Sequence, residues 1–254
     1  MKNNKLIIIS QFLLVILFLI LWEYLSNKNI INSFIFSSPS KIFKCIINLY
    51  KTGNLFNHIF VTLNETLTAF VLSITLSLFI AIFLYQFNIM FKILEPFLTI
   101  LNSMPKIALG PLFIILFGAG RNSIIIMALS ITLIINILTI HNGFLSTDKY
   151  LLKLLDSLNA SKIKKLKYLV IPSAYNIIIN SLKINISMTL IGVIMGEFLV
   201  SKAGIGYLII YGTQVFNLTL VMSGIVILMI ISYILYIIIN YIEKKLLKKI
   251  SNWC

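Results

Sequence analysis

Six long runs of apolar residues, separated by shorter polar stretches, dominate the pattern along this chain. A helix needs roughly 20 residues to cross a hydrocarbon layer of about 30 Å, and each run is near that length. The pattern therefore predicts an all-α protein with about six membrane-spanning helices. We place them near residues 6–25, 60–85, 97–117, 122–141, 174–199 and 218–242.

The polar stretches are too short to fold as soluble domains. The two longest, 27–58 and 142–172, have about 30 residues each, which is less than an independent hydrophobic core needs. In the first, Ser37-Ser38-Pro39-Ser40 predicts a helix start for residues 41–50. We therefore divide the chain into an N-terminal anchor with an external segment, 1–58, and a membrane core, 59–254.

A loop within that core, 146–172, has the pattern of two short helices. Four of its leucines recur at helical spacing and share one face. They are Leu151, Leu154, Leu155 and Leu158. Asn159 and Ala160 then predict a stop, since Asn tolerates the left-handed conformation, and Ser161 is a suitable cap for the next helix. Pro172 is expected to end that second helix. An apolar face on a polar loop predicts a protein partner.

Composition supports a membrane protein, and charge predicts its orientation. The chain is 59% hydrophobic with a mean hydropathy of +1.03. Its net charge of +14 could suit nucleic acid, but the lysines flank apolar runs and have no aromatic interleaving. With both termini in the cytoplasm, thirteen basic residues lie inside and six outside. The positive-inside rule therefore predicts that loop 146–172 faces the cytoplasm. The chain is expected to be a multi-pass protein of the inner or plasma membrane.

The third apolar run is interrupted in a way that broken membrane helices share. It contains Pro105, Lys106, Gly110 and Pro111. Irregular backbone inside a membrane is tolerated where protein or a water-filled cavity surrounds it, and broken helices often line transport paths. These residues are candidates for a translocation path, and the alternative is a kink that only shapes packing. Lys106 either lies near the membrane centre or extends toward an interface.

The fifth run holds two charged residues and a pair of glycines. Lys183 and Glu197 are further candidates for the path or its gating, and Glu197 can instead pair with a lysine. Gly192 and Gly196 have the GxxxG spacing that allows close helix packing, either within one chain or across a dimer.

Enzymatic chemistry and a metal site are not indicated. The seven acidic residues are scattered, and His58 and His141 are isolated. Cys45 and Cys254 fall on opposite sides of the predicted topology, so a disulfide between them is not expected. The chain contains no G-x-x-x-x-G-K-[ST] phosphate loop, so any ATP hydrolysis must come from another subunit.

Several motifs, in order, resemble the permeases of binding-protein-dependent ABC importers. The family's loop signature is E-A-A, three residues, Gly, nine residues and I-x-L-P. Here Lys153-Leu154-Leu155, Asn159 and Leu169-Val170-Ile171-Pro172 keep that spacing. The resemblance extends from about 35 to 253, to the sulfonate, nitrate, taurine and thiamine-precursor branch. It rests on SSPSKI (37–42), LEPFLTILNSMPKIALGPLFIILFGAGRNS (94–123), GVIMGEFLVSKAGIGYLI (192–209) and Trp253.

The resemblance implies a type I importer permease with a five-helix core plus one N-terminal helix. It also implies a homodimer, two separate ATPase subunits and an external substrate-binding protein. The loop would be the coupling helix, and the chain would bind no cofactor, because ATP and Mg are used by the ATPase. Six positions depart from the family. In the loop signature Lys153 reverses the charge of a glutamate, Leu154 and Leu155 replace alanines, and Asn159 replaces glycine. Glu65 and Ala69 stand where the branch usually has arginine and glycine.

Two other functions remain open from the residues alone. A secondary transporter driven by an ion gradient also uses broken helices, but it predicts inverted repeats and paired membrane carboxylates, and the sequence shows neither. A membrane scaffold, or a degenerate permease, would dock some other cytoplasmic protein on the loop. The solute is expected to be a small sulfonate, taurine, nitrate-like anion or thiamine-precursor pyrimidine, as the resemblance implies.

Overall fold

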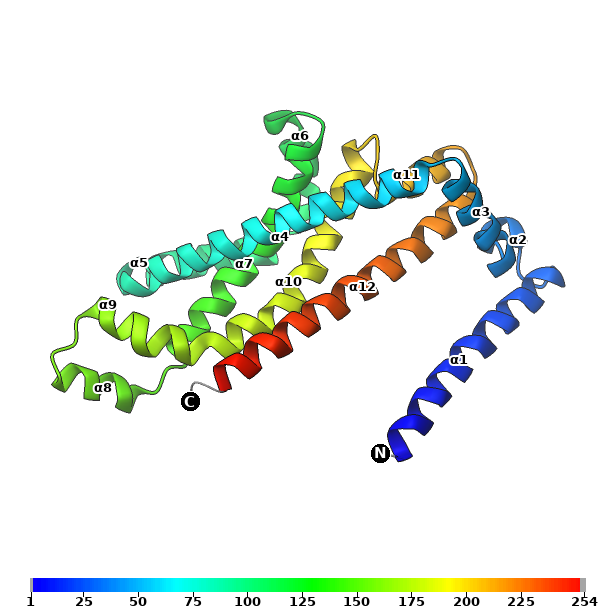
Figure 1. Cartoon of the computed structure of the whole chain (residues 1–254). Coiled ribbons are helices and arrows are strands. Elements are labelled where there is room, and N and C mark those ends of the chain that lie inside the picture. The colour runs from blue at the N-terminus through cyan, green and yellow to red at the C-terminus, as the bar shows by residue number, and fades with distance from the viewer. Residues whose placement is uncertain (1, 252–254) are drawn as a thin grey trace. The chain divides into compact units, whose positions relative to one another are not determined.

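A computed structural model describes residues 2–251, and all regular elements in that range are helices (Figure 1). Trp253 and Cys254 lie outside the described residues. Five helices are long and apolar enough to cross a membrane. They are α1 (Lys2–Asn27), α4 (Asn54–Gln86), α7 (Arg121–Leu145), the continuous helix that ends as α10 (Ile171–Val200), and α12 (Leu218–Ser251).

The third predicted span is a bent pair of helices. α5 (Asn88–Ser103) meets the segment formed by η1 (Lys106–Leu109) and α6 (Gly110–Phe117) at an angle of 89°. The predicted span over 97–117 is therefore not one straight helix, and the predicted break at Pro105 is confirmed. A residue before proline avoids helical geometry, and Met104 is accordingly extended, with ψ 144°. Counting this pair as one span gives six, as the hydrophobic pattern predicted.

The helices form two compact units. The first contains the chain up to Val61 together with Ala203–Ile230, and the second contains Thr62–Lys202 together with the chain from Ile231 onward. The first unit includes two short helices that the hydrophobic pattern did not predict, α2 (Ser33–Phe36) and α11 (Ile205–Gln214). α2 has only four residues, too few for a periodic signal, whereas α11 has ten residues and buries five of them.

Local capping builds the external segment of the first unit. α3 (Pro39–Lys51) contains the helix predicted for 41–50 and begins two residues earlier, with the Ser38 hydroxyl as its cap. The Glu23 carboxylate of α1 accepts hydrogen bonds from the Ser40 backbone N–H at 3.0 Å and from the Ser40 hydroxyl at 2.9 Å. These contacts tie the start of α3 to the end of α1.

The second unit is built around α7 and α10, which pack along one another. One buried cluster forms where α4, α7 and α10 meet, from Ala69, Ile124, Ala128 and Val193. Another joins the ends of α4 and α7 to the start of α10, from Ala81, Ile140, Phe144, Leu166, Val170 and Ala174. The second cluster anchors the loop between α7 and α10 to the helical body.

Candidate functional site

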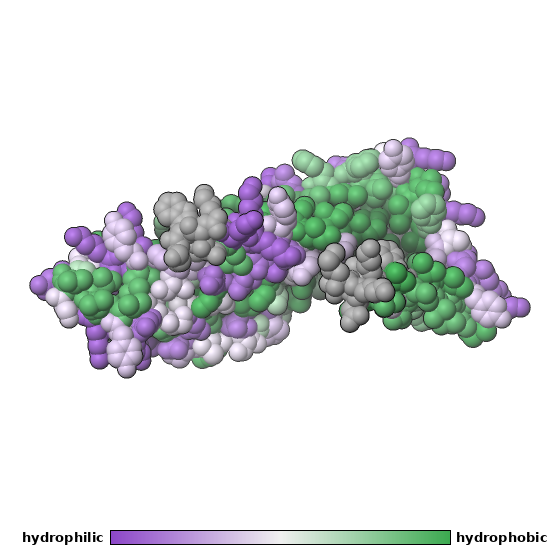
Figure 2. Space-filling view, turned by 60° about the horizontal axis from the view of Figure 1, so that its bottom comes forward, coloured by the Kyte–Doolittle hydropathy of each residue, from purple (hydrophilic) through white to green (hydrophobic). Residues whose placement is uncertain are grey.

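The predicted leucine face lies on α8 (Lys149–Ser157), which has no buried residue. Asp148 caps this helix, because its carboxylate accepts the Tyr150 backbone N–H at 2.8 Å. Three of the four predicted leucines keep 44%, 56% and 69% of their surface exposed; they are Leu151, Leu154 and Leu158. Leu155 is partly buried. Figure 2 shows the apolar patch at the left end of the molecule, bordered by hydrophilic groups, where Figure 1 places α8.

The turn after α8 has the predicted stop and restart. Asn159 adopts φ 51°, in the left-handed region that Asn tolerates and β-branched residues avoid. The Ala160 N–H donates to the Leu155 carbonyl at 2.9 Å, which closes the end of α8. The Ser161 hydroxyl then accepts the Lys164 backbone N–H at 3.4 Å and caps α9 (Lys162–Lys165).

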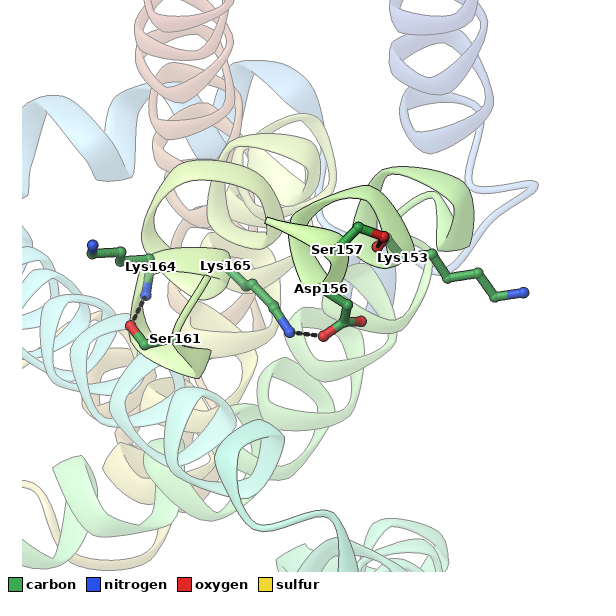
Figure 3. Close-up of polar contacts among 6 residues, drawn as sticks. All are labelled: Lys153, Asp156, Ser157, Ser161, Lys164 and Lys165. Atoms are coloured by element: carbon green, nitrogen blue, oxygen red, sulfur yellow. Dashed lines mark hydrogen bonds and ion pairs between the residues drawn. The ribbon is translucent and has the colours of Figure 1, made fainter. Parts of the chain in front are cut away.

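A surface ion pair links the two loop helices. The Lys165 ammonium on α9 pairs with the Asp156 carboxylate on α8 (Figure 3). Lys153, the residue with reversed charge in the signature, points away from both helices (Figure 3). Its exposed charge is therefore available to a partner.

The second loop helix does not end at Pro172, so that prediction is wrong. The helix continues over Lys162–Val200. Just before the proline, η2 (Leu166–Val170) is a π-helix in which the Ile171 N–H donates to the Leu166 carbonyl, five residues back. Proline fits the first turn of a helix, and the wider turn ahead of it adapts the hydrogen bonding to the missing donor. The loop and the membrane core are thus joined by one helical rod.

The bent span holds four of the predicted path residues. Pro105 lies at the bend, and Gly110 and Pro111 form the first turn of α6, where proline is well tolerated. The Lys106 ammonium donates to the Asn102 carbonyl at 3.0 Å and to the Asn102 side-chain oxygen at 3.1 Å. Its charge therefore lies at the C-terminal end of α5, where the helix dipole favours a cation.

Lys183, another predicted path residue, is paired within the helical body. Its ammonium lies 2.5 Å from a Glu243 carboxylate oxygen on α12. The Glu243 side chain is only 8% exposed and that of Lys183 29%. A buried carboxylate needs a compensating charge, and Lys183 provides it.

Gly192 and Gly196 pack against α7 of the same chain. A Cβ atom at Gly192 would lie 2.6 Å from the Ala128 Cα, and one at Gly196 would lie 3.0 Å from the Ile124 Cα. Only glycine allows the two backbones to approach this closely. The structure thus assigns the GxxxG spacing to packing within one chain, which the sequence had left open.

Glu197 meets other polar groups inside the protein. It is fully buried, and the Thr62 hydroxyl of α4 donates to its carboxylate at 2.6 Å. Glu65 follows Thr62 by one helical turn, is 4% exposed, and has its carboxyl hydrogen-bonded to that of Glu197. The expectation that the membrane segments contain no paired carboxylates is wrong, because folding brings together two acidic residues that are far apart in the sequence.

A match to a family model over most of the chain establishes the family of this protein. Residues 73–248 match the model of the family described as the binding-protein-dependent transport system inner membrane component. The chain belongs to this family. It is therefore the membrane-embedded permease subunit of an ABC importer, and this family consists of transport subunits.

Named relatives cover nearly the whole permease. A probable ABC transporter permease protein of Haemophilus influenzae is 27% identical over 238 residues, which are 94% of this chain and 96% of the relative. The riboflavin transport system permease protein of Chloroflexus aurantiacus is 28% identical over 91% of this chain and 87% of its own. The putative aliphatic sulfonates transport permease protein of Bacillus subtilis is 25% identical over 90% and 83%.

Solved structures share the fold. The MetNI methionine ABC transporter, in an inward facing conformation, matches 77% of this permease and 97% of its own chain with a TM-score of 0.66, at 17% identity. This likeness shows a type I importer permease fold, as the sequence predicted.

Sequence reasoning missed a buried polar stripe on α4 that contains the partners of Glu197. Its members are small or polar, recur at helical spacing and are all buried: Thr62, Glu65, Thr66, Ala69, Ser73 and Ser77. The Asn136 side-chain amide of α7 donates to the Ser73 hydroxyl at 2.9 Å. Such contacts between spanning helices are worth about 0.6 to 2 kcal/mol each. The periodic spacing within the second apolar run is the signal that would have revealed this stripe.

Proposed function

We propose that this permease carries a small organic solute across the cell membrane, driven by separate ATPase subunits that grip α8. The observation that carries the proposal is the unpartnered leucine face of α8. Its exposed leucines lie on a helix without a buried residue. Exposed apolar residues gathered on one helical face favour insertion into a groove of a partner.

The connection of α8 to the membrane core transmits movement of a bound ATPase subunit to the membrane helices. The ion pair between Lys165 and Asp156 holds α8 to α9, and the helix that begins in α9 runs on to Val200. A displacement of α8 therefore moves a membrane-spanning helix rather than a flexible tether. Closure of the ATPase subunits on ATP and Mg would switch the permease between inward-open and outward-open states.

The proposed assembly has two copies of this permease, two ATPase subunits and an external substrate-binding protein. Both termini of the permease lie in the cytoplasm, as the distribution of lysines favours. The relatives differ in the solutes that their names give, namely aliphatic sulfonates, riboflavin, taurine and formylaminopyrimidine. We therefore propose a small organic solute that the binding protein selects.

The test is a charge placed on the leucine face. Leu158→Asp adds a carboxylate where 69% of the leucine is exposed, and Ser157→Asp adds the same charge one residue away, outside the leucine face. Burying a leucine stabilises a complex by about 1.5 to 3 kcal/mol, so loss of this contact lowers affinity at least about tenfold. We expect Leu158→Asp to lose both the copurifying ATPase and solute uptake, while both variants insert normally into the membrane. Equal ATPase recovery from the two variants would show that α8 is not the docking helix.

A further inference from the structure

Two buried carboxyl groups meet where α4 lies against α10. Glu65 is 4% exposed and Glu197 is fully buried. Their carboxyl groups are hydrogen-bonded to each other, and Thr62 donates to Glu197 from the preceding turn of α4. An ionised carboxylate can only accept hydrogen bonds. A hydrogen bond between two carboxyl groups therefore requires a proton on one of them.

Among the described residues, no neighbouring positive charge forms an ion pair with Glu65 that would stabilise it without that proton. From α7, Arg121 acts on Glu65 electrostatically, but its guanidinium donates to the Asn64 side-chain oxygen at 2.5 Å and to the Thr68 hydroxyl at 3.1 Å. Lys106 of η1 is bonded to Asn102, and Lys202 follows the end of α10 as an exposed residue. In the described part of the chain Glu65 forms no ion pair.

The remaining polar atoms beside Glu65 strengthen the case for a neutral group. Its second carboxyl oxygen, Oε2, is buried without a hydrogen-bond partner, and so is the hydroxyl oxygen of Thr66. A buried anion needs several donors or a counter-ion, whereas a protonated carboxyl group needs far fewer. One proton is thus shared between the Glu65 and Glu197 carboxyl groups.

We propose that Glu65 and Glu197 form a proton-binding site, in which one shared proton joins α4 to α10. Release of the proton leaves two like charges in a site closed to water, and the contact opens. The folded pair therefore binds one proton more than the same residues do in the unfolded chain at neutral pH. By linkage, the stability that the pair contributes is present at low pH and is lost as pH rises.

The test uses the purified full chain in detergent, with melting temperatures measured from about pH 5 to about pH 9, on either side of neutrality. Glu65→Gln keeps a hydrogen-bond donor that does not titrate, and Glu65→Arg replaces the proton with a fixed positive charge. Glu95→Gln removes an exposed carboxylate and is the matched control.

The unmodified chain and the control are expected to lose stability together toward alkaline pH. In both position-65 variants this loss should shrink by at least about tenfold in the ratio of folded to unfolded protein, because each pH unit of proton linkage is worth tenfold. An unchanged pH profile in Glu65→Gln would overturn the proposal.

Infrared spectroscopy gives a second readout that needs no variant. The unmodified chain at neutral pH should show the carbonyl band of a protonated carboxyl group with slow hydrogen exchange, and absence of that band would overturn the proposal. Both readouts concern the isolated chain, so their outcome is independent of the proposed transport cycle.

Discussion

Alanine at Gly192 should destabilise this permease, even though alanine favours a helix over glycine by about 1 kcal/mol. The added Cβ would lie 2.6 Å from the Ala128 Cα, whereas ordinary contacts begin at 3.4 Å. α7 and α10 would have to separate by about 0.8 Å, and a backbone atom cannot rotate away. Overpacking of this kind costs about 1 to 3 kcal/mol, and we take the upper value. The expected net loss is about 2 kcal/mol.

Two other glycines along the same helix pair provide matched controls. At Gly196 the nearest atom is the Ile124 Cα at 3.0 Å, so overpacking and helix propensity should nearly cancel. At Gly143 the nearest atom is a side-chain methyl carbon of Ile177 at 3.2 Å, so it needs to move by only about 0.2 Å to reach an ordinary contact distance. Gly143→Ala should therefore be neutral or stabilising by up to about 1 kcal/mol.

The assay is thermal unfolding of the three variants in one detergent at one protein concentration. All three substitutions add the same methyl group to a helix, so the differences isolate the closeness of α7 to α10. The expected order of stability is Gly143→Ala, then Gly196→Ala, then Gly192→Ala. Equal melting temperatures, or a more stable Gly192→Ala variant, would refute the close packing.

Two further predictions concern a buried charge and a strained turn. Lys183→Met should cost about 3 to 5 kcal/mol because it leaves the Glu243 carboxylate buried and uncompensated, and adding Glu243→Gln should restore most of the loss; a double variant as unstable as the single one in thermal unfolding would contradict this. Asn159→Gly should keep solute uptake, whereas Asn159→Val should lower it by straining the left-handed turn by about 1 to 2 kcal/mol; equal uptake by the two variants would mean that the turn does not matter.

The features that the sequence predicted well depend on near neighbours. The leucine spacing and Asn159 predicted both helices of the loop and the turn between them, since amphipathic periodicity and capping act within a few residues. The motif Ser37-Ser38-Pro39-Ser40 predicted the start of α3 to within two residues for the same reason. The number of spans followed from hydrophobic length, because lipid requires about 20 apolar helical residues.

Of the two helix ends predicted at prolines, one is correct and one is wrong. Pro105 does end α5, because the residue before it is extended. Pro172 does not end its helix, because the π-turn of η2 precedes it and buried Leu166 and Val170 hold this segment in the core. The local rule is the same at both positions, and packing decided between a bend and a continuous rod.

The sequence by itself determined that this chain is a membrane permease with an amphipathic loop, because hydropathy, helix periodicity and motif spacing are properties of the linear sequence. Only the tertiary structure decided which polar residues meet. It turned Lys183 toward Glu243, placed Gly192 and Gly196 on α7, and joined Glu65 to Glu197. The physical reason is that burial forces each polar group to find a partner, and those partners come from helices that are distant in the sequence.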